Sequence, residues 1–160
     1  MDVFTPDDFR YQYVWKSTQY QNNQFRFYVM ACHDVHVNLS PREGEVYYEA
    51  VLGGWNNTMS VIRLANVHLQ EHQATGIVNC NEWRLFWISW TEATIRVGKG
   101  SELFKNTFLE WNDPSFAGIN HLSFSCGYGS SGQWVFNEDR GLYSSFLICC
   151  IICRPYRSPN

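Results

Sequence analysis

Positive charge is scarce in this chain, which has 12 Lys and Arg residues against 15 Asp and Glu and a net charge of −3 over 160 residues. A mildly acidic balance provides no basic surface for nucleic acid or for an anionic membrane, so neither is expected as a partner. No apolar run reaches the roughly 18 residues of a membrane span. The first ten residues, MDVFTPDDFR, lack the basic and apolar regions of a secretion signal, which favours a cytoplasmic protein.

Cysteine is also sparse, since six residues, at positions 32, 80, 126, 149, 150 and 153, are fewer than a small disulfide scaffold has. Three of them lie in the apolar run FLICCIIC, which predicts a buried strand within 144–153. On a strand, Cys149 and Cys153 point to one face and Cys150 to the other. We expect packed thiols here. A disulfide within or between chains is the alternative, and its pairing is left open.

Helical periodicity is missing too, because no stretch keeps a 3.6-residue apolar period for three turns. Only VHLQEHQ (67–73) could form a short helix. The chain is instead rich in aromatic residues, with 7 Trp, 9 Tyr and 11 Phe. Short β-branched and aromatic runs predict strands at 25–31, 45–52, 60–67, 84–90, 94–98, 107–111, 119–126, 133–137 and 144–152. They indicate one domain over residues 1–160, an all-β, two-sheet antiparallel sandwich that is jelly-roll-like.

The connections between these strands sort into two ends of the sandwich if consecutive strands run antiparallel. One end collects GGWNNT (53–58), NEW (81–83), GKGSE (98–102) and GYGSSG (127–132). The other end collects TEAT (91–94) and NDPSFAG (112–118). The first end is therefore rich in Gly, Asn, Ser and Trp.

Several segments together resemble a known family. They are ACHDVHVNLS (31–40), YYEAVLGGWNNTMSVIR (47–63), FWISWTEATIRVGKG (86–100), FLEWNDPSF (108–116) and CGYGSSGQWVF (126–136). The chain resembles, from about residue 25 to 137, the farnesoic acid O-methyltransferase-like domain of invertebrate proteins, and the apolar strand at 144–153 lies outside this match. The family name implies methyl transfer from S-adenosylmethionine to a sesquiterpenoid acid. The family's occurrence as a module of larger extracellular proteins implies binding and an extracellular location.

The glycines do not support the methyltransferase alternative. A typical methyltransferase binds its cofactor at a glycine-rich turn between a strand and a helix of a doubly wound sheet. The one G-x-G-x-x-G pattern is Gly127, Gly129 and Gly132, and the segment after it, QWVFN, predicts another strand. We therefore interpret it as a β-turn with positive φ angles and expect no cofactor.

The histidines give no clear catalytic or metal site. His68 and His72 fit the H-x-x-E-H pattern of some zinc peptidases, but on a strand they would lie about 13 Å apart. We interpret this segment as an exposed polar stretch between strands. His33 and His36 flank Asp34, and we expect one of the two to be buried and the other to lie at the surface. No G-x-S-x-G motif is present, and we expect neither catalytic residues nor a metal.

The tryptophans give the best functional lead. Trp87 and Trp90 occupy one strand on opposite faces, and at least one should be core. Trp55 and Trp83 lie in or beside polar loops at one end, where exposed apolar area suggests a binding surface. Asn56-Asn57-Thr58 is a glycosylation sequon as well as a turn signal. The candidate carbohydrate-binding residues are Trp55, Asn56, Asn57, Trp83, Arg84, Lys99, Glu102, Tyr128, Ser130 and Ser131.

We therefore expect a non-catalytic recognition module, a carbohydrate-binding lectin whose ligand is a glycan or glycoprotein. The alternatives are the S-adenosylmethionine-dependent enzyme that the family name implies and a protein–protein interaction module. Packing of Trp55 and Trp83 as caps of the sandwich is the structural alternative to a sugar site. The apolar strand at 144–153 also predicts a homo-oligomer, a dimer or a tetramer, through edge pairing.

Overall fold

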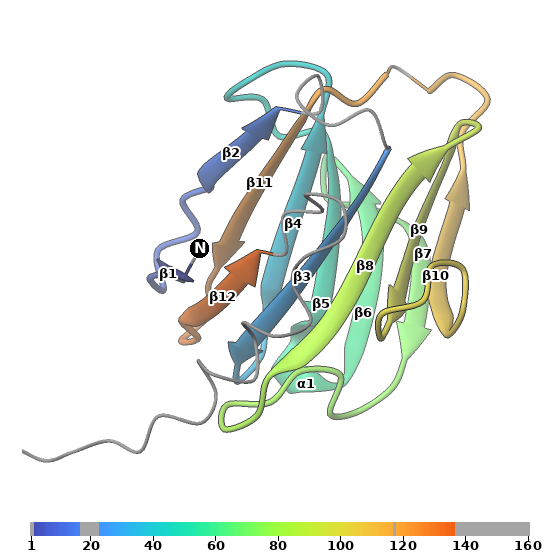
Figure 1. Ribbon diagram of the computed structural model, residues 1–160. Coiled ribbons are helices and arrows are strands. Elements are labelled where there is room, and N and C mark those ends of the chain that lie inside the picture. Colours follow the sequence, from blue (N-terminus) through green and yellow to red (C-terminus); the bar gives the residue numbers. More distant parts are fainter. Residues whose placement is uncertain (1, 17–22, 117, 137–160) are drawn as a thin grey trace, which may run out of the picture.

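The computed structural model describes residues 2–16, 23–116 and 118–136, which form two six-stranded antiparallel sheets packed face to face (Figure 1). In the first sheet the order is β1 (Asp2–Thr5), β12 (Gly132–Phe136), β3 (Gln24–Ala31), β8 (Arg84–Thr91), β9 (Thr94–Lys99) and β10 (Thr107–Asn112). In the second sheet it is β2 (Gln12–Lys16), β11 (His121–Cys126), β4 (Val35–Ser40), β5 (Tyr48–Gly53), β6 (Met59–Leu64) and β7 (Val67–Gln73). The predicted all-β sandwich is confirmed.

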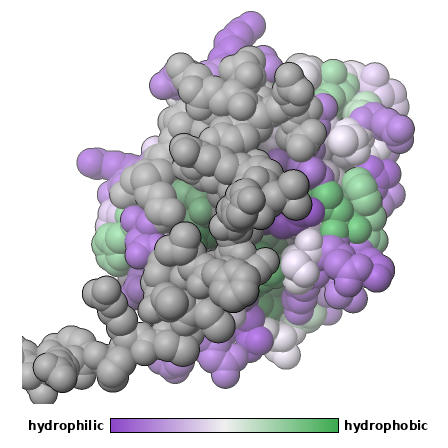
Figure 2. All heavy atoms as spheres, in the orientation of Figure 1, coloured by the Kyte–Doolittle hydropathy of each residue, from purple (hydrophilic) through white to green (hydrophobic). Residues whose placement is uncertain are grey.

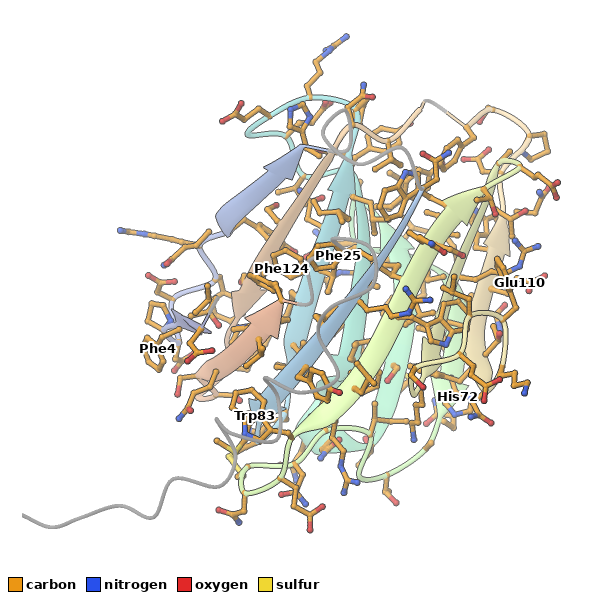
Figure 3. The ribbon with its side chains drawn as sticks, in the orientation of Figure 1. Phe4, Phe25, His72, Trp83, Glu110 and Phe124 are labelled. Atoms are coloured by element: carbon orange, nitrogen blue, oxygen red, sulfur yellow. A yellow bond between two sulfur atoms is a disulfide. The ribbon has the colours of Figure 1, made fainter. Side chains whose placement is uncertain are left out.

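Alternation along the strands builds the core between the sheets. In β3, every second side chain is buried, starting with Phe25 and Phe27. Phe25 packs across the sandwich on Phe124 of β11, with 5.5 Å between the ring centres (Figure 3). Trp134 of β12 lies 5.2 Å from the same Phe124 ring and is fully buried. Much of the aromatic excess in the sequence is therefore core packing.

Both tryptophans of β8 are buried, so the prediction that at least one is core is confirmed. Trp90 belongs to the core cluster between the sheets. Trp87 lies on the outer face of the first sheet, where its Nε1 donates a hydrogen bond to the backbone oxygen of Lys105 at 3.2 Å. The loop after β9 therefore covers Trp87. Gly98 of the neighbouring strand leaves room for the ring, because a Cβ there would lie 2.2 Å from it.

The structure differs from the predicted strands in the second sheet. Residues 35–40 form β4, which was not predicted, because its alternating polar side chains hid a strand that is buried on both faces. Residues 67–73 form the edge strand β7, so a short helix there is wrong. The predicted strand 45–52 begins only at Tyr48. The predicted strand at 144–153, with Cys149, Cys150 and Cys153, lies outside the described residues.

One end of the sandwich gathers the loops that the sequence grouped together. Because all paired strands are antiparallel, the connections after β5, β7, β9 and β11 fall at the same end. α1 (Gly54–Asn57) lies there too (Figure 1). A disulfide between Cys32 and Cys80 joins the β3–β4 connection to the β7–β8 connection at this end. The sequence did not predict this pairing.

The remaining described cysteine, Cys126, is buried, and burial raises the pKa of its thiol to about 12. Among the described residues, no helix is long or apolar enough to cross a membrane. On the face shown in Figure 2, and outside the grey atoms, hydrophobic residues form small groups between hydrophilic ones.

Candidate functional site

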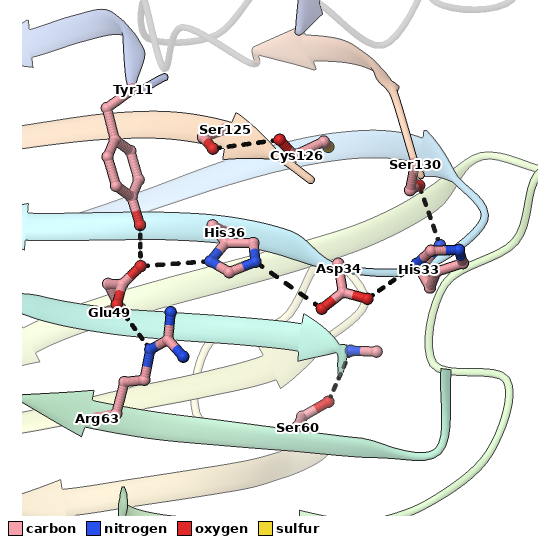
Figure 4. A network of polar contacts seen from close by, with 11 residues as sticks. Tyr11, His33, Asp34, His36, Glu49, Ser60, Arg63, Ser125, Cys126 and Ser130 are labelled. Atoms are coloured by element: carbon pink, nitrogen blue, oxygen red, sulfur yellow. Dashed lines mark hydrogen bonds and ion pairs between the residues drawn. The ribbon is translucent and has the colours of Figure 1, made fainter. Parts of the chain in front are cut away.

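A network of charged side chains lies on the outer face of the second sheet, next to the loop-rich end (Figure 4). His36 of β4 lies opposite Val51 of β5, and Glu49 of β5 lies opposite Arg63 of β6. The same alternation that points Ala50 and Leu52 into the core points these side chains outward. They are nevertheless largely buried, so the two central strands are covered on both faces.

Glu49 is the centre of this network. Its Oε1 accepts a hydrogen bond from the Tyr11 hydroxyl, and its Oε2 accepts one from Arg63 Nε at 2.6 Å. His36 Nδ1 lies 3.3 Å from Oε1 and carries the proton there, because a carboxylate can only accept. Burial opposes ionisation of Glu49, but the hydrogen bonds from His36, Arg63 and Tyr11 outweigh it and lower its pKa to about 2. Glu49 is therefore charged at neutral pH.

The network continues toward the end of the sandwich through Asp34. His36 Nε2 lies 3.9 Å from Asp34 Oδ1, and His33 Nδ1 lies 2.8 Å from Asp34 Oδ2. The Ser130 hydroxyl accepts the backbone N–H of His33 at 3.2 Å, which ties the β11–β12 turn to this segment. His36 is buried, which confirms that one of the two histidines is buried, whereas the other, His33, is half-buried and does not lie fully at the surface. Carboxylates and imidazoles thus alternate from β5 to the loop end.

A pocket of about 390 Å³ opens beside this network. We call it the Trp55 pocket; its lining is His33, Asp34, His36, Val51, Trp55, Asn56, Arg63 and Tyr128. Two of its aromatic residues remain exposed, Trp55 by 46% and Tyr128 by 65%. Trp55 packs edge-on against His68, and Tyr128 against Phe9, with ring centres 5.1 and 4.5 Å apart. The pocket therefore combines supported, solvent-facing rings with fixed polar groups.

The backbone that carries Trp55 has an unusual conformation. Trp55, Asn56 and Asn57 have φ angles of 52°, 59° and 61°, in the left-handed region. This confirms the predicted turn at the two asparagines, which tolerate such angles. A bulky residue such as Trp rarely does, at a cost of about 1–3 kcal/mol. The side chain of Asn57 holds the turn in place, because it bonds both the N–H and the carbonyl of Val78.

A second pocket, of about 310 Å³, lies at the same end of the molecule. We call it the end pocket; its lining is Gly76, Ile77, Trp83, Arg84, Leu85, Phe86, Lys99 and Gly100. Trp83 is half-buried, and Figure 3 shows it at the end of the sandwich where α1 lies in Figure 1. The end pocket shares no lining residue with the Trp55 pocket.

The predicted carbohydrate-binding residues thus divide into separate groups. Trp55, Asn56 and Tyr128 line the Trp55 pocket. Trp83, Arg84 and Lys99 line the end pocket. The other four line neither pocket: Asn57 and Ser130 hold backbone groups, Glu102 pairs with Lys105, and Ser131 is exposed.

Sequence reasoning missed five lining residues of the Trp55 pocket: His33, Asp34, His36, Val51 and Arg63. The histidines show no clear catalytic or metal pattern, and nothing in the sequence pattern singles out Arg63. The available signal was a Glu on one predicted strand and an Arg on the next, at positions that face each other across a hairpin. That signal needs the β5–β6 register, which the sequence did not define.

The H-x-x-E-H segment lies on β7 and does not form a metal site. His68 Nδ1 contacts Glu71 at 2.6 Å, whereas His72 packs on the Phe108 ring at 5.3 Å. Within residues 2–16, 23–116 and 118–136, no group of three or more His, Cys, Asp and Glu side chains could hold a metal ion.

The glycine-rich turn does not fit S-adenosylmethionine, the cofactor that the family name implies. The Ser130 N–H donates to the Gly127 carbonyl at 3.1 Å, and β12 follows, which confirms the predicted β-turn. A Cβ on Gly127 would lie 2.1 Å from the Phe9 ring, and one on Gly132 would lie 2.6 Å from Cys126 Sγ. These two glycines therefore make room for the protein's own side chains, and no helix follows the turn to hold a nucleotide.

Comparisons with known proteins agree with this fold. The farnesoic acid O-methyl transferase family matches residues 7–140 of the chain. A BTB/POZ domain-containing protein of Arabidopsis thaliana is 26% identical over 94 residues, which are 54% of this chain and 12% of that protein. The chain therefore spans only a small part of that relative.

Two solved structures have a similar fold. The galectin LEC-6 of Caenorhabditis elegans is 12% identical with a TM-score of 0.52, and the match covers 84% of this chain and 95% of the galectin. A prokaryotic β-1,3-1,4-glucanase (lichenase) from a mouse hindgut metagenome is 9% identical with a TM-score of 0.52, and the match covers 84% of this chain and 78% of the lichenase. At such identities the likeness shows a shared sandwich fold.

Proposed function

The chain belongs to the farnesoic acid O-methyl transferase family, and from its fold and pockets we propose that it is a non-catalytic module that binds carbohydrate. The observation that carries this proposal is the Trp55 pocket, where two exposed aromatic rings flank a fixed network of charged groups. Binding sites commonly combine an apolar lining with a few converging polar groups. In the Trp55 pocket, the aromatic rings and the polar groups lie together at the loop-rich end of the sandwich.

The chemistry of the pocket suits a sugar ring. A sugar has an apolar C–H face, which packs on an aromatic ring such as Trp55, and an edge of hydroxyl groups. Those hydroxyls need both donors and acceptors. Arg63 supplies guanidinium donors, and Asp34 supplies a carboxylate acceptor.

The pocket is also preorganised for binding. Glu49 holds the Arg63 guanidinium at 2.6 Å, and Asp34 holds His33 at 2.8 Å, so these polar groups lose little freedom when a ligand binds. Trp55 is kept in a left-handed backbone conformation, at φ 52°. Strained backbone conformations of bulky residues are concentrated at functional sites, so this one supports a binding role for the Trp55 side chain.

The fold gives independent support. The galectin and the β-glucanase that share this sandwich both act on or bind carbohydrate by their names. Their likeness concerns the fold alone, so the ligand and the residues of this chain are argued from its own pocket.

Location and assembly are part of the proposal. The Cys32–Cys80 disulfide is typical of an oxidising compartment, which supports an extracellular location. A shallow sugar site contributes little free energy per hydrogen bond, so several sites in a homo-oligomer would raise the overall affinity. Light scattering at micromolar concentration tests assembly, and a monomeric mass would rule the oligomer out.

Glycan-array binding, followed by titration with the best sugar, tests the Trp55 pocket. We expect Trp55→Ala to weaken binding about tenfold or more, because the main apolar contact is lost. The matched control is Phe104→Ala, which removes an aromatic ring that is 56% exposed and lies outside the pocket. Equal loss in the two variants, or no loss in either, would contradict the assigned site.

The methyltransferase alternative is separated by calorimetric titration with S-adenosylmethionine. Because the glycine turn is filled by Phe9 and Cys126, we expect no binding heat. Clear saturable binding of S-adenosylmethionine would favour the enzyme over the carbohydrate-binding module.

A further inference from the structure

Two partly exposed cationic side chains, Lys99 and Arg84, line the end pocket. Lys99 of β9 is paired with Phe86 of β8, and paired residues share a face of the sheet. Phe86 belongs to the core, and Arg84 precedes it by two residues, so Arg84 lies on the same face. Both side chains line the end pocket. Two like charges therefore converge on one cavity.

The hydrogen-bonding capacity of Arg84 is only partly used. Its Nη2 lies 2.9 Å from Glu82 Oε2, but Glu82 is largely exposed, which makes this a surface ion pair of little strength. Its Nε is buried and has no hydrogen-bond partner within the described part of the chain. A buried donor without an acceptor is costly, and an oxygen placed in the pocket would remove that cost.

Lys99 has no acidic partner within ion-pair distance among the described residues, and its ammonium group lies 5.9 Å from the centre of the Phe108 ring. Burial, and then the nearby charge of Arg84, lower the pKa of Lys99. The acid that follows it in the chain, Glu102, is paired with Lys105 instead. Glu82 therefore offsets one of the two positive charges, and the charge of Lys99 has no described carboxylate within ion-pair distance.

We propose that the end pocket binds the acidic group, a carboxylate or a sulfate, of an acidic saccharide. A guanidinium and an ammonium that converge on one cavity match an oxyanion, which accepts several charge-assisted hydrogen bonds. The half-buried ring of Trp83 lies beside them and offers an apolar surface for the sugar that carries the acid. This second site rests on the proposed carbohydrate-binding function but uses residues separate from the Trp55 pocket.

The test compares four probes at constant ionic strength: sodium sulfate, a sulfated disaccharide, a uronic-acid disaccharide and a neutral disaccharide. Binding is followed by the NMR signal of the Trp83 indole N–H and by calorimetry. The variants are Arg84→Gln and Lys99→Gln, each with its amide spectrum recorded to show that the fold is kept. The matched control is Lys105→Gln, which removes one positive charge at an exposed lysine outside the pocket.

We expect the two acidic disaccharides to shift the Trp83 signal and to bind more tightly than sulfate alone. Each pocket variant should weaken this binding about tenfold, whereas Lys105→Gln should change it less than twofold. Equal weakening in Lys105→Gln would assign the effect to net charge and overturn the proposal. Sulfate bound as tightly as the sulfated disaccharide, or no probe bound at all, would also overturn it.

The same titrations separate this proposal from the proposed function. Trp55→Ala should weaken neutral-sugar binding about tenfold or more but leave the shift of the Trp83 signal by acidic probes unchanged. If acidic probes bind in a way that depends on Arg84 but no neutral sugar binds, the result supports the end pocket as a binding site. The same result contradicts the assignment of the Trp55 pocket as a sugar site. Loss of the Trp83 shift in Trp55→Ala would overturn the separate second site.

Discussion

Replacement of Glu49 by Gln is the sharpest test of the charged network. Gln has the shape of a protonated Glu, so the variant keeps the size of the side chain and removes only the charge. The amide can accept at one position, but its NH2 group then faces Tyr11 or Arg63, which are themselves donors. The buried guanidinium of Arg63 thereby loses its counter-charge.

The expected cost follows from the pKa of Glu49. Its value of about 2, against an ordinary 4.5, corresponds to about 3 kcal/mol in favour of the charged form in the folded state. Partial solvent screening reduces this figure, so we expect Glu49→Gln to lower the free energy of unfolding by about 2–3 kcal/mol at pH 7. Urea unfolding followed by tryptophan fluorescence measures it.

The pH dependence of this cost has a definite sign. Because the folded-state pKa of Glu49 is lowered, its contribution is complete above pH 4.5 and is lost as the pH falls from 4.5 toward 2. The stability difference between the wild-type protein and Glu49→Gln should therefore close over this range. Other carboxylates titrate in both proteins alike and largely cancel in the difference.

Glu110→Gln is the matched control. Glu110 of β10 also pairs across strands with an arginine, Arg96 at 2.9 Å, but its side chain is 57% exposed (Figure 3). A surface pair of this kind should change stability by less than about 1 kcal/mol. An equal cost for the two variants, or a gap for Glu49→Gln that persists at pH 2, would refute the reasoning.

Two further predictions concern stability and are measured by the same urea unfolding. Gly98→Ala should cost at least about 2 kcal/mol, because the new Cβ would lie 2.2 Å from the Trp87 ring, whereas Gly118→Ala, which meets open space, should be nearly neutral. Replacement of both Cys32 and Cys80 by Ser should cost about 2–4 kcal/mol, because it frees a closed loop with a sequence separation of 48. Unchanged stability would contradict either estimate.

The sequence was sufficient for the fold class because the evidence for strands is local. Alternation in FRFYVMA and FWISW marks one buried face, and the structure places Phe27, Phe86 and Trp90 in the core. Strand β4 was missed because His36 and Asn38 make its outer face polar, although both are buried. Burial of polar residues on an outer face depends on what covers them, and that cannot be read from the strand itself.

The candidate site was less predictable because it depends on register and on contacts between distant segments. Trp55 and Tyr128 line one pocket, and their position at the same end could be predicted, because loop parity follows from strand order alone. The contact between Glu49 and Arg63 needs the β5–β6 register, and the hydroxyl of Tyr11 reaches Glu49 across 38 positions of sequence. The separation of Trp83 from Trp55 likewise follows from the three-dimensional arrangement of loops.

The Cys32–Cys80 disulfide also changes how a cut chain would behave. Every peptide bond between these two cysteines lies inside a covalent ring, and the ring includes the exposed residues 75 and 76 of the β7–β8 connection. A single proteolytic nick there would open the ring but leave both fragments joined through sulfur. The nicked protein would keep its mass under non-reducing conditions and separate into two pieces only after a thiol reductant is added. Because that connection forms a wall of the end pocket, such a nick would disturb this pocket while the disulfide still joins the β3–β4 and β7–β8 connections.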